Sequence, residues 1–373
     1  MPIAIPSFAK INLGLRIGPR RADGFHELRT VYQTIDLHDI VRVSVERGTG
    51  IEVHCEDPHV PTDSANTCYR IVECAMKAMR ARGKVVIEIE KKLPIQGGLG
   101  GASGNAVSAL LALERVLRKQ LSGAERLRIA SEVGSDLPLF LIGGTVLGVG
   151  RGEEVYPLPD LPAMPCVIAL PEIAVSTPQA FADWDDLISS GCHSEPASAG
   201  EESAVPNQMQ VPRLRGSSAG QRSSSLGMTE LKRTQKLKNP TTSDRMSEFS
   251  REVSAWLSAA EMKHGRRSGV SARGGGRAEN PLLDLVRTGI ENDFEKVVFP
   301  KYPELREVKR VLERSGAVYE SLSGSGSAVY GLFGSRERAS AAAKKLQKQG
   351  TRAVVTSTLT RRQYWKKLRA ASN

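Results

Sequence analysis

The sequence of 373 residues predicts an α+β protein with two folded halves and a long polar segment between them. Three observations support this prediction: strand-like alternation before residue 160, a β-β-α-β pattern after residue 280, and an abrupt change in composition near residue 189. Apolar residues make up 40% and charged residues 25% of the chain, as in ordinary globular proteins. A fully disordered chain, a collagen and a coiled coil are therefore excluded.

The elements of the first half are predicted from the period at which apolar residues recur. Apolar and polar residues alternate at 41–46 and 85–90, as in half-buried strands, and 8–17 is predicted as a further strand. Apolar stripes at helical spacing predict helices at 106–116 and 127–133. The first half is therefore expected to be a domain of mixed strands and helices.

The second half follows another pattern. Strands are predicted at 318–322 and 328–333 with a turn between them, followed by a helix at 336–349 and a strand at 352–357. This β-β-α-β order indicates a smaller sheet with a helix packed on it.

The segment between the halves is rich in Ser, Gly, Arg, Glu and Pro and poor in aromatic residues. Such a composition buries too little apolar surface to offset the entropy of ordering the chain. An exception is 246–262, where apolar residues at helical spacing predict a short helix. The expected organisation is a first domain at 1–160, the start of a second domain at 161–188, a mostly disordered insertion at 189–279, and the rest of the second domain with a basic tail at 280–373.

The charge of the chain leaves two classes of ligand open. Lys and Arg number 52 against 41 Asp and Glu, and the net charge of +11 suits nucleic acid or phosphate-rich small molecules equally. No run approaches the roughly 18 apolar residues of a membrane span, and the first six residues lack the basic and apolar regions of a secretory signal. Five cysteines without C-x-x-C spacing favour a reducing compartment, so a cytoplasmic protein without a membrane partner is predicted.

The strongest local signal for chemistry is the glycine-rich segment 94–106, PIQGGLGGASGNA. It follows a predicted strand and enters a predicted helix, so backbone N–H groups and the positive end of the helix dipole could hold an anion there. It is neither a Walker A loop nor a dinucleotide fingerprint, because it lacks Lys-Ser/Thr after the last glycine and the G-x-G-x-x-G spacing. A phosphate cradle and a tight turn that only packs a helix on a sheet stay equally open.

Other candidate residues also have ordinary structural explanations. Asp136 could act as a general base if burial raises its pKa, but its spacing before Pro138 favours a helix N-cap. Lys10 and Asn12 share one face of the strand 8–17, which by default faces solvent. The segment 323–327, SGSGS, could close over a phosphate, although a hairpin connection is its commoner use. The six histidines show no spacing typical of a metal site.

Taken in order, these motifs resemble those of the GHMP-type small-molecule kinases. The resemblance extends over most of the chain outside the insertion and is carried by AKINL at 9–13, RADGFHEL at 21–28, the glycine-rich segment 94–106, GSDLPLF at 134–140, GVGRG at 148–152 and LSGSGS at 322–327.

The resemblance implies a GHMP-kinase-like two-domain fold. Its N-terminal half would be like domain 2 of ribosomal protein S5, its C-terminal half an α/β sandwich related to ferredoxin-like folds, and the active site would lie in the cleft between them. The implied activity is transfer of the γ-phosphate of ATP to the 2-hydroxyl of diphosphocytidyl-methylerythritol, a small-molecule substrate of non-mevalonate isoprenoid biosynthesis.

The resemblance also implies catalytic and cofactor-binding roles. Asp136 would take the hydroxyl proton, and Lys10 would orient Asp136 and stabilise the charge that develops in the transition state. The cofactors would be ATP and Mg²⁺, with Ser103 as a metal ligand. The residues expected to cradle the triphosphate are Pro94, Ile95, Gln96, Gly97, Gly98, Leu99, Gly100, Gly101, Ala102, Ser103 and Gly104.

Five residues are implied in substrate binding. Asn12 and His26 would form hydrogen bonds with the substrate, and Phe25, Tyr32 and Phe181 would line or stack on its cytosine.

The chain departs from the family pattern at three places. Gly104 stands where the family usually has a second serine, which would remove a hydroxyl near the triphosphate and leave Ser103 as the remaining loop hydroxyl for Mg²⁺. Phe25 replaces a common tyrosine, and the insertion after Leu187 has no counterpart in the pattern.

Two alternatives remain. Another GHMP kinase acting on homoserine or mevalonate would share the fold, but segment 23–26 and Phe181 argue against it. A nucleic-acid-binding module could use the tail 361–369, which mixes basic and aromatic residues, although an amphipathic terminal helix explains the tail better. No nucleic-acid partner is therefore expected, and a monomer and a homodimer both stay open.

Overall fold

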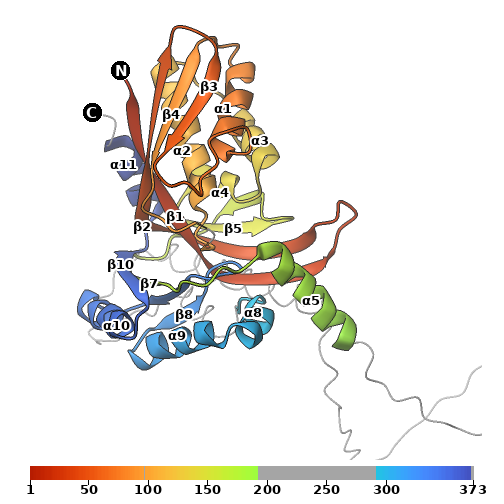
Figure 1. The fold of residues 1–373 in the computed structure, drawn as a ribbon, viewed down its shortest axis with the longest axis vertical. Helices are drawn as coiled ribbons and strands as arrows, with labels where there is room; N and C mark the ends of the chain where they lie inside the picture. The colour runs from red at the N-terminus through yellow and green to blue at the C-terminus, as the bar shows by residue number, and fades with distance from the viewer. Residues whose placement is uncertain (96, 192–290, 371–373) are drawn as a thin grey trace, which may run out of the picture.

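The computed structural model of the chain describes residues 1–95, 97–191 and 291–370 (Figure 1). Gln96, the helix predicted at 246–262 and most of the predicted insertion at 189–279 lie outside these residues.

The first body is a six-stranded sheet with helices. The sheet order is β3-β4-β2-β5-β6, and β1 pairs antiparallel with β2 off this path. The strands are β1 (Ile3–Arg20), β2 (His26–Glu46), β3 (Gly50–Cys55), β4 (Lys84–Glu90), β5 (Thr145–Val149) and β6 (Glu154–Pro157). The helices are α1 (Thr67–Ala78), α2 (Gly101–Leu117), α3 (Gly123–Val133) and the short α4 (Leu137–Ile142). These elements confirm four predictions from the sequence: the strands at 8–17, 41–46 and 85–90 and the helix at 127–133.

The second body is a four-stranded antiparallel sheet in the order β10-β7-β9-β8. The strands are β7 (Pro165–Leu170), β8 (Tyr319–Leu322), β9 (Val329–Leu332) and β10 (Arg352–Ser357), and the helices are α5 (Thr177–Gly191), α8 (Glu295–Lys301), α9 (Pro303–Arg314) and α10 (Arg336–Lys348). One face of this sheet packs on the helices. Helices α9 and α10 lie on the side away from the first body, whereas α5 lies beside the ends of β1 and β2 (Figure 1). The β-β-α-β order predicted for this half is confirmed.

The long strands β1 and β2 join the two bodies. Their upper parts belong to the first core, whereas Ile11, Leu13 and Ile35 from their lower parts pack with Ile168 and Tyr330 of the second sheet. Because β1 is covered on both sides, nearly every residue from Ile5 to Ile17 is buried. The solvent-facing default for Lys10 and Asn12 is therefore wrong: the Lys10 residue is only 3% exposed, and Asn12 is buried beside it.

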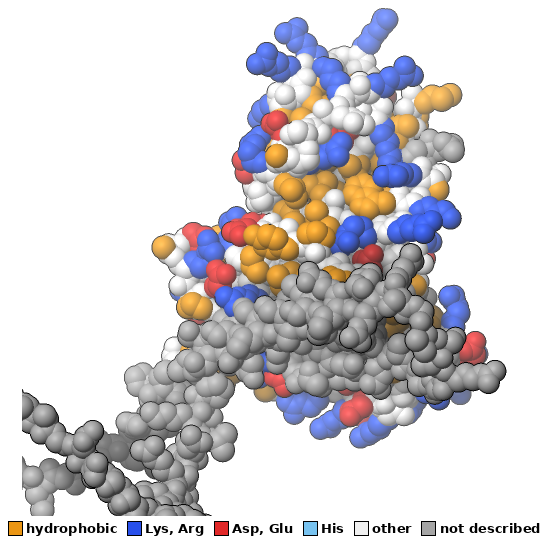
Figure 2. Space-filling model, turned by 180° about the vertical axis from the view of Figure 1, so that it is seen from behind, with side chains coloured by type: hydrophobic (Ala, Val, Ile, Leu, Met, Phe, Trp, Pro, Cys, Tyr) orange, Lys and Arg blue, Asp and Glu red, His pale blue; other side chains and the backbone are white. Residues whose placement is uncertain are grey.

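The C-terminal helix α11 (Arg361–Ala370) returns to the first body, although the predicted organisation grouped the whole of 280–373 with the second domain. Tyr364 and Leu368 are buried in the first core, as expected for an amphipathic helix and not for exposed aromatic platforms. Figure 2 shows Lys and Arg side chains spread over the upper part of the face that it presents. Within the described ranges, no helix is long and apolar enough to span a membrane.

Candidate active site

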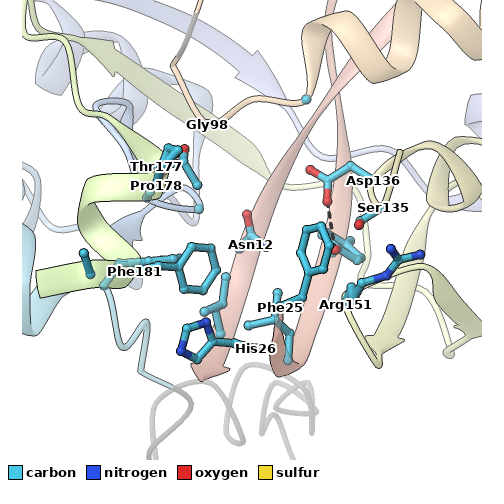
Figure 3. A pocket seen from close by; sticks show the side chains of 18 of the residues that line it. Asn12, Phe25, His26, Gly98, Ser135, Asp136, Arg151, Thr177, Pro178 and Phe181 are labelled. Carbon is cyan, nitrogen blue, oxygen red and sulfur yellow. Dashed lines mark hydrogen bonds between the residues drawn. The ribbon is translucent and has the colours of Figure 1, made fainter. Parts of the chain in front are cut away.

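A cavity of about 650 Å³ lies where the two bodies meet. Its walls come from β1, β2 and the start of α4 in the first body, and from α5 and the loop 323–327 in the second. Figure 3 shows Asp136, Ser135 and Arg151 on one side of this cavity and Thr177, Pro178 and Phe181 on the opposite side. Residues distant in the sequence therefore face one space.

The glycine-rich segment forms one end of the cavity. Gly98 and Gly100 both have a left-handed φ, of +72° and +69°. A Cβ on Gly98 would collide with the carbonyl oxygen of Ser323, and one on Gly100 would lie 2.9 Å from the Lys10 side chain. The α2 helix begins directly after Gly100, and no side chain caps its first N–H groups. These donors are therefore available to an anion, as the cradle hypothesis requires.

The second glycine-rich segment, 323–327, connects β8 to β9 and packs against the first. Ser323 Oγ donates a hydrogen bond to the Gly98 carbonyl at 3.0 Å. The Asn292 amide holds the loop from behind by donating to the carbonyls of Leu322 and Gly324. Gly324 and Ser325 line the cavity, and the Ser325 hydroxyl lies 2.7 Å from that of Thr177. The segment is a hairpin connection that also contributes to the cavity wall.

Lys10 and Asp136 are brought together beside the glycine loop. Lys10 Nζ lies 3.5 Å from Asp136 Oδ2, and the Asp136 side chain is 33% exposed. Asp136 does stand at the N-cap position of α4, but its side chain caps no backbone N–H. Its carboxylate is turned to Lys10 and Tyr32 instead, and the structural role predicted from spacing is not realised.

Asn12 holds the lysine in place. Lys10 Nζ donates to Asn12 Oδ1 at 2.7 Å, and Asn12 Nδ2 donates to Thr30 Oγ1 at 2.8 Å. The Thr30 hydroxyl in turn donates to the Gly14 carbonyl at 2.7 Å. This chain of bonds fixes the amide with its oxygen toward the ammonium group. Asn12 lines the cavity, but in the structure its amide is engaged in orienting Lys10.

Tyr32 lies with the carboxylate and not with the other predicted cytosine contacts. Its hydroxyl donates to Asp136 Oδ1 at 3.0 Å, and Lys10 Nζ lies 5.7 Å from its ring centroid. Burial raises the pKa of Tyr32 well above its ordinary value, and the Asp136 carboxylate raises it further, so the phenol keeps its proton. Tyr32 is 2% exposed but still belongs to the cavity lining, so its predicted place beside the cytosine stays a prediction.

The opposite end of the cavity is aromatic. The rings of His26 and Phe181 stack at 4.9 Å with an interplanar angle of 7°, and His26 Nε2 lies 2.7 Å from Asp185 Oδ1. Phe25 is 53% exposed, and its ring lies 5.1 Å from the Arg151 guanidinium carbon. Phe25 and Phe181 stand on opposite sides of the cavity (Figure 3). Their separation leaves space between two aromatic walls.

Several residues of the cavity wall were missed from the sequence. They are Arg20, Ser135, Arg151, Thr177 and Asp185, whereas Ser325 belongs to the segment 323–327, already predicted as a candidate phosphate loop. Arg151 belongs to the segment 148–152, GVGRG, which carries part of the family resemblance but was assigned no role in the site. A basic residue inside that glycine cluster was the available signal. The remaining ones come from segments whose proximity depends on the tertiary fold.

The start of α2 also borders a smaller cavity of about 240 Å³ on the other side of the loop. Pro94, Ile95, Gly101 and Ala102 line it. Gly104 does not face either cavity: a Cβ there would lie 2.8 Å from the Phe8 carbonyl of β1. Position 104 is therefore a close contact between helix and strand, which gives a packing reason for glycine instead of the loss of a phosphate-facing hydroxyl.

Comparisons with known proteins agree with this geometry. Two family models match, GHMP kinases N terminal domain at residues 66–144 and GHMP kinases C terminal at 279–352. A 4-diphosphocytidyl-2-C-methyl-D-erythritol kinase of Solibacter usitatus is 33% identical over 330 residues, covering 88% of this chain and 81% of that protein. The protein of the same name from Acaryochloris marina is 31% identical, with 91% and 89% covered.

Solved structures share the fold. A crystal structure of 4-(cytidine 5'-diphospho)-2C-methyl-D-erythritol kinase matches with a TM-score of 0.61 and 26% identity, covering 95% of this chain and 99% of that one. A homoserine kinase from Cytophaga hutchinsonii gives a TM-score of 0.62, with 96% and 95% covered, but only 18% identity. The second likeness concerns the fold alone.

Proposed function

The chain belongs to the GHMP kinases, and we propose that it phosphorylates the 2-hydroxyl of 4-diphosphocytidyl-2-C-methyl-D-erythritol with ATP. The observation that carries the proposal is the Lys10–Asp136 pair, at 3.5 Å, packed directly against Gly100 of the glycine loop. A carboxylate, a buried cation and a phosphate cradle thus share one end of a cavity whose other end is aromatic.

The catalytic step follows from how the carboxylate is held. Tyr32 donates a hydrogen bond to Asp136 Oδ1, whereas Oδ2 lies 3.5 Å from Lys10 Nζ, and we assign acceptance of the hydroxyl proton to Oδ2. As this proton moves to Asp136, the substrate oxygen forms a bond to the γ-phosphorus, the bond to the β-phosphate oxygen breaks, and ADP leaves. Phosphoryl transfer needs mainly positioning and charge neutralisation, and the Lys10 ammonium supplies part of the positive charge.

We place the nucleotide along the glycine loop. The uncapped N–H groups at the start of α2 suit the triphosphate, and the cavity lined by Ile95 and Ala102 suits the nucleoside beyond it. The γ-phosphate then lies on the side of Gly98 and Gly100, which line the larger cavity with Lys10 and Asp136.

The side chains present are compatible with Mg²⁺ held mainly by phosphate oxygens. In the part of the chain that the structure describes, no three or more His, Cys, Asp or Glu side chains gather as a metal site. Mg²⁺ in phosphotransferases keeps several waters and takes only one or two protein oxygens in addition to phosphates. Ser103, half-buried in the first turn of α2, is the loop hydroxyl that would be a protein ligand to the ion. When bound, the ion would neutralise phosphate charge.

The aromatic end is proposed to bind the cytidine diphosphate part of the substrate. The cytosine would lie between Phe25 and Phe181, with His26 held by Asp185 at its edge. Arg151, beside Phe25, and Arg20 are the cavity-lining cations available to the diphosphate. This arrangement puts the erythritol unit between the base and the carboxylate.

A direct assay tests this function. Purified protein with Mg-ATP is expected to phosphorylate diphosphocytidyl-methylerythritol with a kcat/KM at least about 100-fold above that for homoserine or mevalonate. The site of phosphorylation is read by phosphorus NMR. Faster turnover of either control substrate, or transfer to a hydroxyl other than the 2-hydroxyl, would contradict the proposal.

A further inference from the structure

We propose that the C-terminal helix α11 positions the catalytic carboxylate by holding the far end of the helix that presents it. The inference rests on the proposed role of Asp136 as the base. Asp136 directly precedes α4, which runs only from Leu137 to Ile142. The segment that matches the GHMP C-terminal model ends at residue 352, so α11 lies beyond it.

Two side chains of α11 donate hydrogen bonds to the last carbonyl groups of α4. A six-residue helix has few internal hydrogen bonds, and its last carbonyls need partners from elsewhere. Tyr364 donates its hydroxyl to the Phe140 carbonyl at 2.6 Å, and Trp365 Nε1 donates to the Ile142 carbonyl at 2.9 Å. These two bonds act as a side-chain cap supplied by the chain terminus.

The Tyr364 ring packs closely against the end of α4 and against β1. Gly143, which ends α4, has a φ of +71°, and a Cβ there would collide with the Tyr364 ring. The same ring packs on Phe8 of β1, two residues before Lys10, at a centroid distance of 5.4 Å. α11 therefore contacts both elements that carry the proposed catalytic pair.

Anchors on the first body fix α11 itself. Arg361 donates through Nη2 to the carbonyls of Thr145 and Leu158, at 2.9 and 3.1 Å. Near the other end, Arg115 of α2 donates to the Leu368 carbonyl at 3.2 Å, and Lys367 pairs with Asp36 at 3.0 Å. Part of the basic charge of the tail is therefore engaged in docking the helix.

The other end of α4 depends on this support. Asp136 makes no capping hydrogen bond, so its carboxylate is located by Tyr32, by Lys10 and by the position of α4. Phe140 also borders the glycine loop, since a Cβ on Gly100 would lie 3.1 Å from its Cζ. A shift of α4 would change the Asp136–Lys10 geometry, and misplacement by about 1 Å can cost on the order of 100-fold in rate.

Conservative variants of the full chain test the proposal. Tyr364→Phe removes only the hydroxyl, and Trp365→Phe removes the indole donor. Each is expected to lower kcat about five- to tenfold, with KM for ATP and for the diphosphocytidyl substrate within about twofold. Amide hydrogen exchange of residues 137–143 is expected to quicken in both variants. Should a variant fail to fold, the other carries both measurements.

Two controls separate positioning from a general loss of stability. Arg362→Ala alters an exposed residue of the same helix, and Leu346→Val lowers stability in the second body by shortening a buried side chain. Both should keep kcat. A kcat within twofold of wild type in Tyr364→Phe and Trp365→Phe, or an equal loss in Leu346→Val, would overturn the inference. If the unaltered protein does not phosphorylate this substrate, the proposed function fails, whereas unchanged exchange in α4 would still refute the positioning on its own.

Discussion

The two ends of the cavity differ in how far contacts within the protein fix their side chains before a ligand binds. At the catalytic end, Lys10, Asn12 and Tyr32 are buried and bonded to one another or to Asp136. At the aromatic end, Phe25 is largely exposed, and its partner wall, Phe181, stands across open space. Charged groups stabilise a transition state most when they are positioned before the substrate binds. A stacking site, in contrast, can form its contacts when the ligand arrives.

Removal of the carboxylate tests the catalytic end with the largest expected effect. Asp136→Asn should lower kcat by about 100- to 10,000-fold, because the amide cannot accept the hydroxyl proton. The melting temperature should change little, since the side chain is one-third exposed. Asp186→Asn, an exposed carboxylate on α5, is the matched control in the same assay. Retained turnover in Asp136→Asn would refute its role as base.

The glycine loop is expected to tolerate no side chain where it meets the loop 323–327. Gly98→Ala forces a left-handed φ on alanine and drives its Cβ into the Ser323 carbonyl. The KM for ATP should rise about tenfold or more, with a lower melting temperature. Gly123→Ala is the control, because a Cβ there meets open space. An unchanged KM for ATP in Gly98→Ala would show that the loop does not hold the nucleotide.

The aromatic end offers a matched pair of residues. Phe25 and Tyr156 are both 53% exposed, but only Phe25 lines the cavity. Stacking of a base on an aromatic ring contributes about 1–3 kcal/mol, so Phe25→Ala should raise KM for the diphosphocytidyl substrate about tenfold while kcat stays within threefold. Tyr156→Ala should change neither constant. Equal effects of the two substitutions on KM would show that Phe25 does not stack on the substrate, and would contradict the assignment of the aromatic end to substrate binding.

The sequence predicted those parts of the fold in which one face of an element is buried. Alternation located β4 because Val85, Ile87 and Ile89 are buried while Glu88 and Glu90 are exposed. It misplaced the solvent face of β1, because that strand is covered on both sides, although Lys10 and Asn12 do share a face and a hydrogen bond. The continuous apolar strand β7 escaped notice, since a short apolar run carries no period that distinguishes strand from helix.

The candidate site was predictable only as far as local motifs reach. Lys10, Asp136, His26 and Phe181 were named from their motifs, and all four line the same cavity, Asp136 and Phe181 on opposite sides of it. Asp185 bonds to His26 across bodies, and no sequence spacing could indicate that pairing. Likewise, the tail was predicted as an amphipathic helix, but its packing on α4 depends on the tertiary fold.

The smallest expected effect lies outside the cavity and separates the pH dependence of stability from that of catalysis. Burial above all, opposed by Lys309 and supported by the Glu313 and Glu295 carboxylates, raises the pKa of Glu320 on β8 to about 7. The pKa in the folded state exceeds the ordinary value of 4.5, so the folded state binds more protons and stability falls as pH rises from about 4.5 to about 7.

Glu320→Gln removes this dependence and should therefore raise the melting temperature by about 2 °C at pH 8 and leave it unchanged at pH 4. The gain is small because the side chain is partly exposed. Glu313→Gln, which removes only the neighbouring charge, should give a smaller gain of the same sign in the same calorimetric scans. Because Glu320 does not line the cavity, kcat should be unaffected at both pH values. A lower kcat in Glu320→Gln would mean that the second sheet, and not only the first body, takes part in preparing the catalytic end.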